Sequence, residues 1–493
     1  MTDAAYDALL GYVKQTTALS EVAGRLGWDQ QTVMPAGSAH QRAEEMAAME
    51  VVLHERKTAP QIGEWLSALS RGSLNQTQRA MVDHIEWSYQ RDVKRPAALM
   101  ERLARVTAQA FDIWAQARAN EDVAAFLPIL DELITLRREE AAALSDGPAY
   151  DALLQDYERG MSAQRISEMF DALRPRLSAL RAAVADAPQI PALTGVFPKD
   201  QQMQIAQLLA QKFNYDLNMG RVDLALHPFS SGSGQDVRIT TRVDESDPLN
   251  CFYSTIHEVG HATYEQNIDA AHFLTPLGQG VSLGVHESQS RIYENQLGRS
   301  RGVVSWLYEQ MTATFKDAQL GSPEALYRVI NRVETGFIRT EADELHYNLH
   351  VALRFTLEQA LMSGDLQSGD LEAAWNDQFT KDFGKTVPCP SQGVLQDVHW
   401  SGGAFAYFPT YSFGNVYAGC LFDAMQTQDE AIAPALDTGD VDPALRWLRE
   451  NVQHHGAALS AQEIIKTATG HSAPNPEPLL SYLEAKYSDI YHL

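Results

Sequence analysis

The sequence contains one short pattern whose residue types suit metal chemistry, H-E-x-x-H at residues 257–261. Its two histidines, His257 and His261, are four residues apart, so on a helix they lie one turn above each other and can reach the same ion. Glu258 lies beside the first histidine, where its carboxylate can act as general base and acid toward a metal-activated water. The pattern predicts a catalytic metal centre, with Zn²⁺ as the expected ion and Co²⁺ or Mn²⁺ as alternatives.

A catalytic zinc site of this kind needs a third protein ligand and one open position. No glycine and histidine follow His261 at the metzincin offsets. Glu287, in H-E-S-Q-S-R at residues 286–291, lies 287 − 261 = 26 residues further on, enough for a turn and a returning antiparallel helix. We expect Glu287 to be the third ligand, and Glu265, one turn beyond His261, is the competing candidate. The bland alternative is a pair of surface histidines that flank an ordinary glutamate.

A second histidine pair, His346 and His350, has the same four-residue spacing, but Tyr347 stands where the glutamate would be. The pair therefore lacks a base. We expect histidines that are hydrogen-bonded in a core or that support the metal ligands.

The elements that must position these residues are mostly helical. Apolar residues recur at helical spacing from Ala4 to about Ala187, with breaks at residues 34–37 and 145–148. Strand signals are confined to about Arg221–Arg242, where two alternating runs flank a Ser/Gly-rich turn at residues 230–234. We expect one metal-site domain, 1–493, made of a helical lobe (1–190), a small β element (219–243), metal-site helices (246–300) and a helical remainder with substrate-binding segments (322–493).

The second alternating run has two unlike faces. Asp236, Arg238 and Thr240 share one face, and Val237 and Ile239 share the other. This pattern fits a solvated edge strand or a strand that borders a cleft.

Helix starts are marked by capping residues and proline. Ser246-Asp247-Pro248 predicts the start of the H-E-x-x-H helix, and Ser322-Pro323 predicts another. Residues 340–343 resemble a capping box, followed by leucines at helical spacing until Gly364. Residues 393–419 are rich in glycine and aromatic residues.

Composition excludes several classes of protein. The 39 Lys+Arg against 64 Asp+Glu give a net charge of −25, which argues against binding nucleic acid or an anionic membrane surface. No apolar stretch is long enough to cross a bilayer. The three cysteines are too few for a disulfide framework, and the acidic N-terminus does not resemble a secretory signal, so we expect a cytoplasmic protein.

Six ordered motifs resemble those of the carboxypeptidase Taq family of metallocarboxypeptidases. They lie at residues 227–229 (HPF), 236–240 (DVRIT), 257–261 (HEVGH), 286–291 (HESQSR), 338–343 (IRTEAD) and 393–400 (GVLQDVHW), and residues 28–30 with 34–35 also look like that family. The resemblance implies a mostly helical, clam-like fold with a deep central groove and a small β-sheet beside the H-E-x-x-H helix. It also implies a homodimer that removes single residues from peptide C-termini with broad specificity. His257, His261 and Glu287 would be the metal ligands, and Glu258 the catalytic carboxylate.

A carboxypeptidase must bind a free terminal carboxylate, against the negative charge of this chain. A local positive group is therefore required. Arg339 is the first candidate, because it lies just ahead of the helix start at residues 340–343. An ion pair between Arg339 and Asp343 is the alternative use of that guanidinium. Arg238 is the second candidate.

The glycine- and aromatic-rich segment offers neutral donors for an oxyanion and for substrate binding: His399, Tyr407 and Tyr411. Core packing is the alternative fate of each. Asp343, Asp397 and Arg291 are expected to orient and support the metal ligands and the histidines.

Two other functions remain open at this point. A metallo-oligopeptidase would cleave internally from the same centre. A non-catalytic helical protein would use the metal only to join its helices, although such structural zinc sites are usually closed by four protein ligands.

Overall fold

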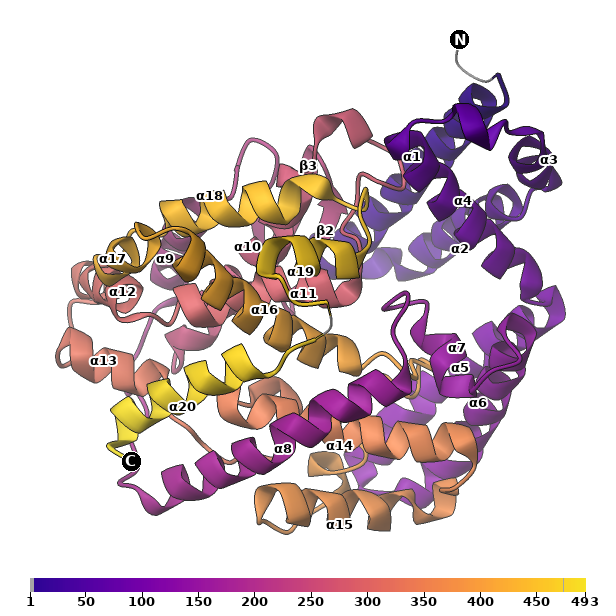
Figure 1. The fold of residues 1–493 in the computed structure, drawn as a ribbon. Coiled ribbons are helices and arrows are strands. Elements are labelled where there is room, and N and C mark those ends of the chain that lie inside the picture. The colour runs from indigo at the N-terminus through magenta and orange to yellow at the C-terminus, as the bar shows by residue number, and fades with distance from the viewer. Residues whose placement is uncertain (1–3, 473) are drawn as a thin grey trace. The chain divides into compact units, whose positions relative to one another are not determined.

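The computed structural model describes residues 4–472 and 474–493, and confirms the mostly helical fold with one small sheet (Figure 1). The described chain forms two compact units. The first comprises the chain as far as Val93, Ala192–Ile330 and the stretch that begins at Cys420. The second comprises Lys94–Pro191, Asn331–Gly419 and Pro474–Leu493.

The first unit contains the expected metal-site helices and the sheet. Its helices are α1 (Ala4–Thr32), α2 (Ala39–Lys57), α3 (Pro60–Ala68), α4 (Gln76–Lys94), α9 (Lys199–Lys212), α10 (Pro248–Asn267), α11 (Leu283–Arg291), α12 (Arg301–Thr314), α13 (Pro323–Ile330), α17 (Ile432–Asp437), α18 (Asp442–Asn451) and α19 (Ala461–Thr469). A π-helical segment, η4 (Ile292–Leu297), continues α11. Helix α4 ends one residue inside the second unit.

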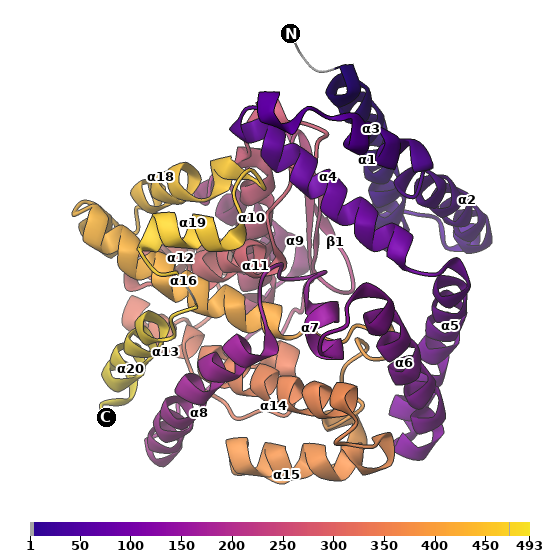
Figure 2. The ribbon, with the colours of Figure 1, turned by 45° about the vertical axis from the view of Figure 1, so that its right-hand side comes forward.

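Among its described residues, the second unit contains helices and no strand. They are α5 (Ala97–Asn120), α6 (Val123–Leu144), α7 (Ala149–Leu154), α8 (Ala163–Asp186), α14 (Glu344–Ser363), α15 (Leu371–Phe383) and α20 (Glu477–Tyr491). Helix α16 (Pro409–Gln428) begins in this unit and ends in the first. Figure 2 shows the long helices α5 and α6 side by side, and α14 packs against α8 and α15.

Helix α10 lies at the centre of the first unit, in contact with α9, α11 and the sheet. It starts as the sequence predicts, because the Asp247 side chain accepts a hydrogen bond from the Leu249 N–H and Pro248 occupies the first turn. Phe252, Ile256 and Val259 are fully buried along it. The helix that carries the H-E-x-x-H pattern is thus fixed by packing on several sides.

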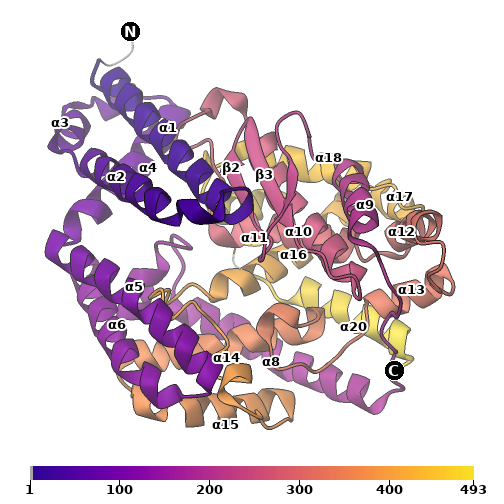
Figure 3. The same ribbon diagram turned by 180° about the vertical axis from the view of Figure 1, so that it is seen from behind.

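The sheet has three strands in the order β1-β3-β2 and lies beside α10 and α1 (Figure 3). Strand β1 (Val222–Leu224) pairs parallel to β3 (Asp236–Thr241), and β2 (Ser230–Ser233) pairs antiparallel to it. One expectation is therefore wrong, because the Ser/Gly-rich stretch at 230–233 is a strand rather than only a turn. Of the two alternatives for the second alternating run, the edge strand is excluded, because β3 is the central strand.

The two faces of β3 are only partly as expected. Val237 and Ile239 are fully buried, as the alternation predicts, and Asp236 and Arg238 are half-buried. Thr240 is also fully buried, because its hydroxyl exchanges hydrogen bonds with the backbone of Phe229. A hydroxyl that is satisfied by backbone atoms can leave solvent at little cost.

Helix α14 starts three or four residues later than the sequence suggests. Residues 339–341 form a short 3₁₀ turn, and the cap is Asp343, whose carboxylate accepts hydrogen bonds from the Leu345 and His346 N–H groups. Its end at Gly364, in the left-handed conformation with φ 94°, is as predicted. None of the described helices is long and apolar enough to pass through a bilayer.

Candidate active site

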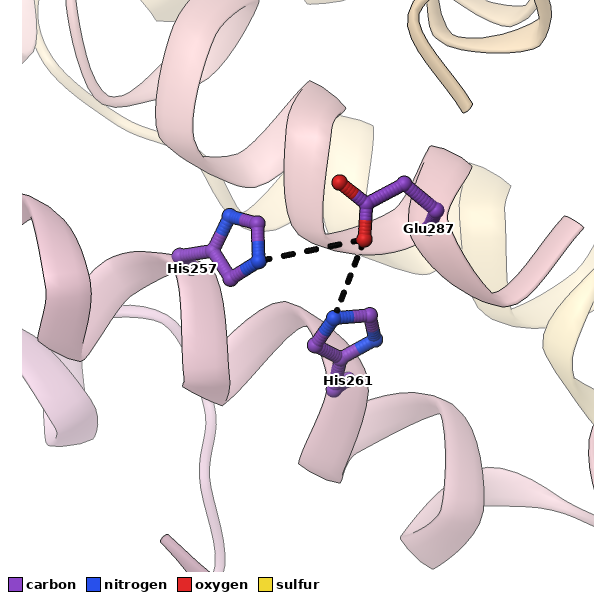
Figure 4. Close-up of side chains that lie close together, drawn as sticks. All are labelled: His257, His261 and Glu287. Atoms are coloured by element: carbon purple, nitrogen blue, oxygen red, sulfur yellow. Dashed lines mark ion pairs between the residues drawn. The ribbon is translucent and has the colours of Figure 1, made fainter. Parts of the chain in front are cut away.

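Three potential metal ligands converge in the first unit. His257 and His261 lie on α10 and Glu287 lies on α11, and one ligand atom from each falls within 4.8 Å of the others (Figure 4). The Glu287 Oε2 atom is 3.9 Å from His257 Nε2 and 3.3 Å from His261 Nε2. Two imidazole nitrogens and one carboxylate oxygen form the donor set that zinc-type ions prefer.

Gly260, inside the H-E-x-x-H pattern, allows the two ligand-bearing helices to approach. A Cβ atom at this position would lie 2.6 Å from the Gln289 carbonyl oxygen and 2.6 Å from the Ser290 Cα. Both of these atoms are backbone atoms of α11, so they have no flexible side chain that could move aside. The glycine therefore has a packing role that the two-histidine spacing alone does not reveal.

His257 is oriented by a carboxylate behind it. Its Nδ1 lies 2.9 Å from Glu294 Oε2, and a carboxylate only accepts, so Nδ1 carries the hydrogen and Nε2 presents its lone pair toward Glu287. Glu294 lies in the π-helical η4 and also pairs with Arg291 and Arg299. Burial opposes ionisation of Glu294, yet His257 and the arginines lower its pKa to about 2.

His261 is oriented by a relay of two residues. Its Nδ1 lies 2.6 Å from His286 Nδ1, and His286 Nε2 lies 2.9 Å from Glu265 Oε1. Because Glu265 only accepts, His286 donates from Nε2 and accepts at Nδ1, which assigns the hydrogen of His261 to Nδ1 and leaves its Nε2 free for a metal ion. Burial lowers the pKa of His261 to about 4, which favours the neutral, ligating form.

Glu265, the competing candidate for the third ligand, is committed elsewhere. Its Oε1 atom also accepts a hydrogen bond from the Gly280 N–H at 3.0 Å. The carboxylate thus faces His286 and the loop before α11, and the cluster of ligand atoms contains Glu287 instead.

The two carboxylate oxygens of Glu287 face different neighbours, Arg291 on one side and the two histidines on the other. Arg291 Nε donates to Oε1 at 2.6 Å, and Oε2 faces the histidines and accepts from the Ser290 hydroxyl at 3.2 Å. Burial would raise the pKa of Glu287, but the Arg291 charge and the two histidines hold it far below its usual range. The structure places Arg291, a predicted supporting residue, directly on this ligand.

Glu258 is only 6% exposed, and burial raises its pKa to about 7. A carboxylate with a pKa near neutrality can both accept a proton and return it at physiological pH. The pKa of a carboxyl group rises in this way when its charged form is poorly solvated.

Arg238, the second candidate for carboxylate binding, is paired within the first unit. Its guanidinium donates to both carboxylate oxygens of Asp236, at 2.7 and 3.0 Å, and lies over the Trp28 ring at 4.5 Å. Asp236 also accepts from Arg25 at 2.8 Å. The carboxylate of Asp236 thus largely neutralises the charge of the Arg238 guanidinium.

Arg339, the first candidate, belongs to a buried charge cluster of the second unit. Its Nε donates to Asp397 Oδ1 at 3.2 Å and its Nη1 donates to the Tyr347 hydroxyl at 3.0 Å. Fully buried Arg354 donates to the other oxygen of Asp397 at 2.6 Å and to Gln396 Oε1 at 2.7 Å. The alternative pair of Arg339 with Asp343 is not formed.

This cluster holds two guanidinium groups against one carboxylate. Burial opposes the charge on each arginine, but Asp397 and nearby tyrosines raise the pKa of Arg339, and the pKa of Arg354 is lowered only to about 10. Burial likewise opposes the charge on Asp397, yet both arginines keep its pKa low. At neutral pH the cluster therefore carries an excess of positive charge.

The predicted aromatic donors gather around the same cluster. The Tyr411 Oη lies 3.5 Å from His399 Nε2, and the rings of Tyr407 and Tyr411 meet edge to face at 5.4 Å. The Arg339 guanidinium lies over the Tyr411 ring at 4.8 Å. Burial, with help from the arginines, lowers the pKa of His399 to about 4, so this ring is neutral at physiological pH.

The second histidine pair does not belong to the cluster of possible metal ligands found among the described residues. Buried His346 bonds through Nδ1 to Asp343 at 2.9 Å and through Nε2 to the Thr335 hydroxyl at 3.1 Å, as expected of a core histidine. Neither ring nitrogen of His350 has a hydrogen-bond partner among the described residues, and its ring packs 4.5 Å from that of Phe383. Asp343 thus supports His346 and the start of α14, not a metal ligand.

Four contributors escaped the sequence reasoning: Glu294, Arg299, Arg354 and Gln396. Glu294 is seven residues past Glu287, which is a signal for the same helix face. Gln396 lies beside Asp397 in a motif. Arg354 and Arg299 carry no local signal. The partner of Arg354, Asp397, lies 43 residues away in sequence, and the partner of Arg299, Glu294, lies on a π-helical turn.

Two histidines and a glutamate on adjoining helices, with a buried glutamate beside the first histidine, define a metallohydrolase centre. The sequence profile described as "Carboxypeptidase Taq (M32) metallopeptidase" matches residues 8–487, and the chain belongs to this family of metallocarboxypeptidases.

Similar proteins span the full chain. Thermostable carboxypeptidase 1 of Thermus thermophilus is 37% identical over 99% of this chain and 99% of its own. The crystal structure of the M32 carboxypeptidase from Deinococcus radiodurans R1 covers 100% of both chains, with 35% identity and a TM-score of 0.97. Metallocarboxypeptidase 1 of Trypanosoma cruzi covers 98% of this chain and 99% of its own, with 34% identity and a TM-score of 0.95. The resemblance seen in the motifs is thereby confirmed.

Proposed function

We propose that this metallocarboxypeptidase uses Zn²⁺, held by His257, His261 and Glu287, with Glu258 as its catalytic base and acid. The observation that carries the proposal is that one ligand atom from each of these three residues lies within 4.8 Å of the others, and that a carboxylate or a histidine contacts the far side of each histidine. Three protein ligands leave a position open for chemistry, unlike a closed structural site.

When bound, the metal ion polarises the peptide carbonyl and acidifies a water molecule. Glu258 accepts the proton of the attacking water and delivers it to the leaving nitrogen. Its burial and its pKa of about 7 suit both halves of that transfer. Glu294, His286 and Glu265 keep the two histidines in the tautomer that ligates.

We assign the terminal carboxylate of the peptide to Arg339. Its Nη2 makes no hydrogen bond within the described chain, while Asp397 and Tyr347 hold the other nitrogens of the guanidinium in place. Arg354 adds positive charge that Asp397 does not cancel. His399, Tyr407 and Tyr411 supply neutral donors for the substrate or the developing oxyanion.

A peptide ladder tests the reaction directly. Zinc-loaded protein incubated with an unblocked peptide should release residues one at a time from the C-terminus, as read by mass spectrometry, and should be largely inactive on the same peptide with a C-terminal amide. Equal cleavage of both peptides at internal bonds would favour a metallo-oligopeptidase. Metal analysis of protein purified without added metal tests the choice of zinc over cobalt or manganese.

We also propose a homodimer in the cytoplasm. The three cysteines are all free, which fits a reducing compartment, and the motif resemblance implies the dimer. Light scattering on the purified protein measures the oligomeric state, and cell fractionation measures the compartment.

A further inference from the structure

The segment between Trp400 and Phe408 has an unusual backbone. Gly403 and Ala406 both have positive φ, 68° and 63°, and Ala406 has a Cβ that disfavours this conformation. Such strain is unfavourable and persists only where the surroundings enforce it. The residues that contact this segment must therefore hold its backbone in the strained conformation.

Glu358, on α14, is the main anchor of this segment. Its side chain is fully buried and accepts hydrogen bonds from Trp400 Nε1 at 2.8 Å, from the Ala406 N–H at 3.1 Å and from the Tyr150 hydroxyl at 3.2 Å. The nearest arginine on the same helix, Arg354, is already bonded to Asp397. Glu358 is thus a buried carboxyl group that the proposed chemistry does not use.

The anchored segment leads directly into the aromatic cluster. His399 precedes Trp400, and Tyr407 follows Ala406, with its ring 5.3 Å from the ring of Tyr157. Tyr411 lies in the first turn of α16. A shift of the strained segment would therefore move His399 and Tyr407 together.

We propose that Glu358 is a positioning residue for peptide hydrolysis, which fixes the path of residues 400–406 and thereby aims His399, Tyr407 and Tyr411 at the substrate. This inference rests on the substrate roles proposed above for those three residues.

The chemistry of the contact explains why a carboxyl group is needed. Burial raises the pKa of Glu358 to about 8, and a carboxyl group, protonated or not, offers two oxygen atoms that accept from Trp400, Ala406 and Tyr150. A glutamine of the same shape has one acceptor and two donor hydrogens. Its NH₂ group would face either the Ala406 N–H or the Trp400 N–H, donor against donor.

Glu358→Gln is therefore the informative variant, with Asp382→Asn as its matched control. Asp382 is a buried carboxylate of the same unit whose pKa is also raised by burial, and it contacts Gln378 and Arg174 but not residues 400–411. We expect kcat/KM on an unblocked peptide to fall about tenfold for Glu358→Gln and less than twofold for Asp382→Asn, because only the first change leaves a buried donor of residues 400–406 without an acceptor. Zinc content should be unchanged in both.

A second background separates positioning from general damage. In the triple variant His399→Gln/Tyr407→Phe/Tyr411→Phe, adding Glu358→Gln should lower kcat/KM by less than twofold. A loss of the same size in both backgrounds, or no loss in either, overturns the proposal. Full activity of the triple variant by itself would refute the substrate roles of these three residues. The effect of Glu358→Gln in the wild-type background would still show whether Glu358 matters for turnover.

A measurement independent of turnover completes the test. The indole N–H of Trp400 should shift in a ¹⁵N-correlated NMR spectrum of Glu358→Gln and stay in place in Asp382→Asn. An unshifted Trp400 signal would show that the hydrogen bond does not hold the segment, and the proposal would fall.

Discussion

At the scale of single residues, the proposed metal centre depends as much on where its protons lie as on which side chains would bind the metal. His257 donates a hydrogen bond from Nδ1 to Glu294, and His261 donates one from Nδ1 to His286. Glu287 divides its two oxygens between Arg291 and the histidines. The proposed centre is therefore arranged to bind a cation, and the roles of Glu258 and Glu294 are separable by mutation.

Replacing Glu258 by glutamine should abolish turnover and leave the metal bound. The ligands are untouched, but an amide cannot accept the proton of the attacking water, and general acid–base catalysis contributes about 10²–10⁴-fold. Parallel assays of kcat and of zinc content by atomic absorption measure the two effects. Retention of wild-type kcat would refute the assignment of Glu258 as the base.

Replacing Glu294 by glutamine should weaken metal binding with a smaller effect on chemistry. Loss of a carboxylate that orients a ligating histidine typically costs about 10–100-fold in metal affinity. Competition with a chromophoric chelator measures the change. Glu309→Gln, at an exposed position of α12, is the control and should bind metal like the wild type; equal affinities for both variants would show that Glu294 does not orient His257.

At the scale of elements, the close approach of α10 and α11 brings the proposed ligands from two helices within reach of one ion. The approach depends on Gly260, and the π-helical turn of η4 brings Glu294 behind His257. π-helical turns are often found at functional sites for this reason, since they re-aim side chains that regular helix would direct elsewhere.

Gly260→Ala should destabilise the first unit and weaken metal binding together. Its Cβ would meet backbone of α11 at 2.6 Å, and forced repacking costs about 1–3 kcal/mol. Gly24→Ala on α1 is the matched control, because nothing lies within 4 Å of its Cβ. Denaturant melts and metal titrations measure both effects, and an unperturbed Gly260→Ala variant would contradict the packing role.

The element scale also shows what could be predicted from sequence. The His257 and His261 spacing, the start of α10 and the end of α14 depend on local periodicity and caps, and all were predicted. The start of α14 was misplaced because both Thr340 and Asp343 are good caps, and only tertiary contacts select Asp343. Strand β2 was missed because serine and glycine favour turns, and its pairing with β3 is a tertiary event. Arg354 and Glu358 read as ordinary helix residues because their partners are distant in sequence.

Glu358 makes the stability of α14 and its surroundings depend on pH. Its folded pKa of about 8 is above the unfolded value of about 4.3, so the folded state binds the proton more tightly. This stabilisation is complete below about pH 4 and is lost as the pH rises through about 8, at up to about 1.4 kcal/mol per pH unit. The unfolding free energy of wild type relative to Glu358→Gln should therefore fall between pH 5 and pH 8; a pH-independent difference would mean that Glu358 is ionised in the folded state. Arg354 and Tyr150, its charged or titratable neighbours, keep their protons over that range.

At the scale of the whole molecule, the net charge of −25 and the local positive groups serve different purposes. A large negative net charge favours solubility in general, but it repels a peptide carboxylate at long range. The positive charge of Arg339 and Arg354 is buried in the second unit, where low polarisability strengthens it at short range. All three proposed metal ligands, by contrast, lie in the first unit, so metal binding should stabilise the two units unequally.

Removal of the metal should therefore loosen one unit selectively. A ligand that binds only the native state adds about 2.7 kcal/mol of stability when present at 100 times its dissociation constant, and that contribution acts where the ligands are. After chelation, hydrogen exchange followed by mass spectrometry should show faster exchange in peptides from α10, α11 and η4, and unchanged exchange in α14 and α15. His261→Ala is the control, because it lacks a ligand and should already exchange fast and respond little to the chelator. Uniform loosening of both units would mean that they unfold as one cooperative body, and no change in α10 would mean that the metal binds elsewhere.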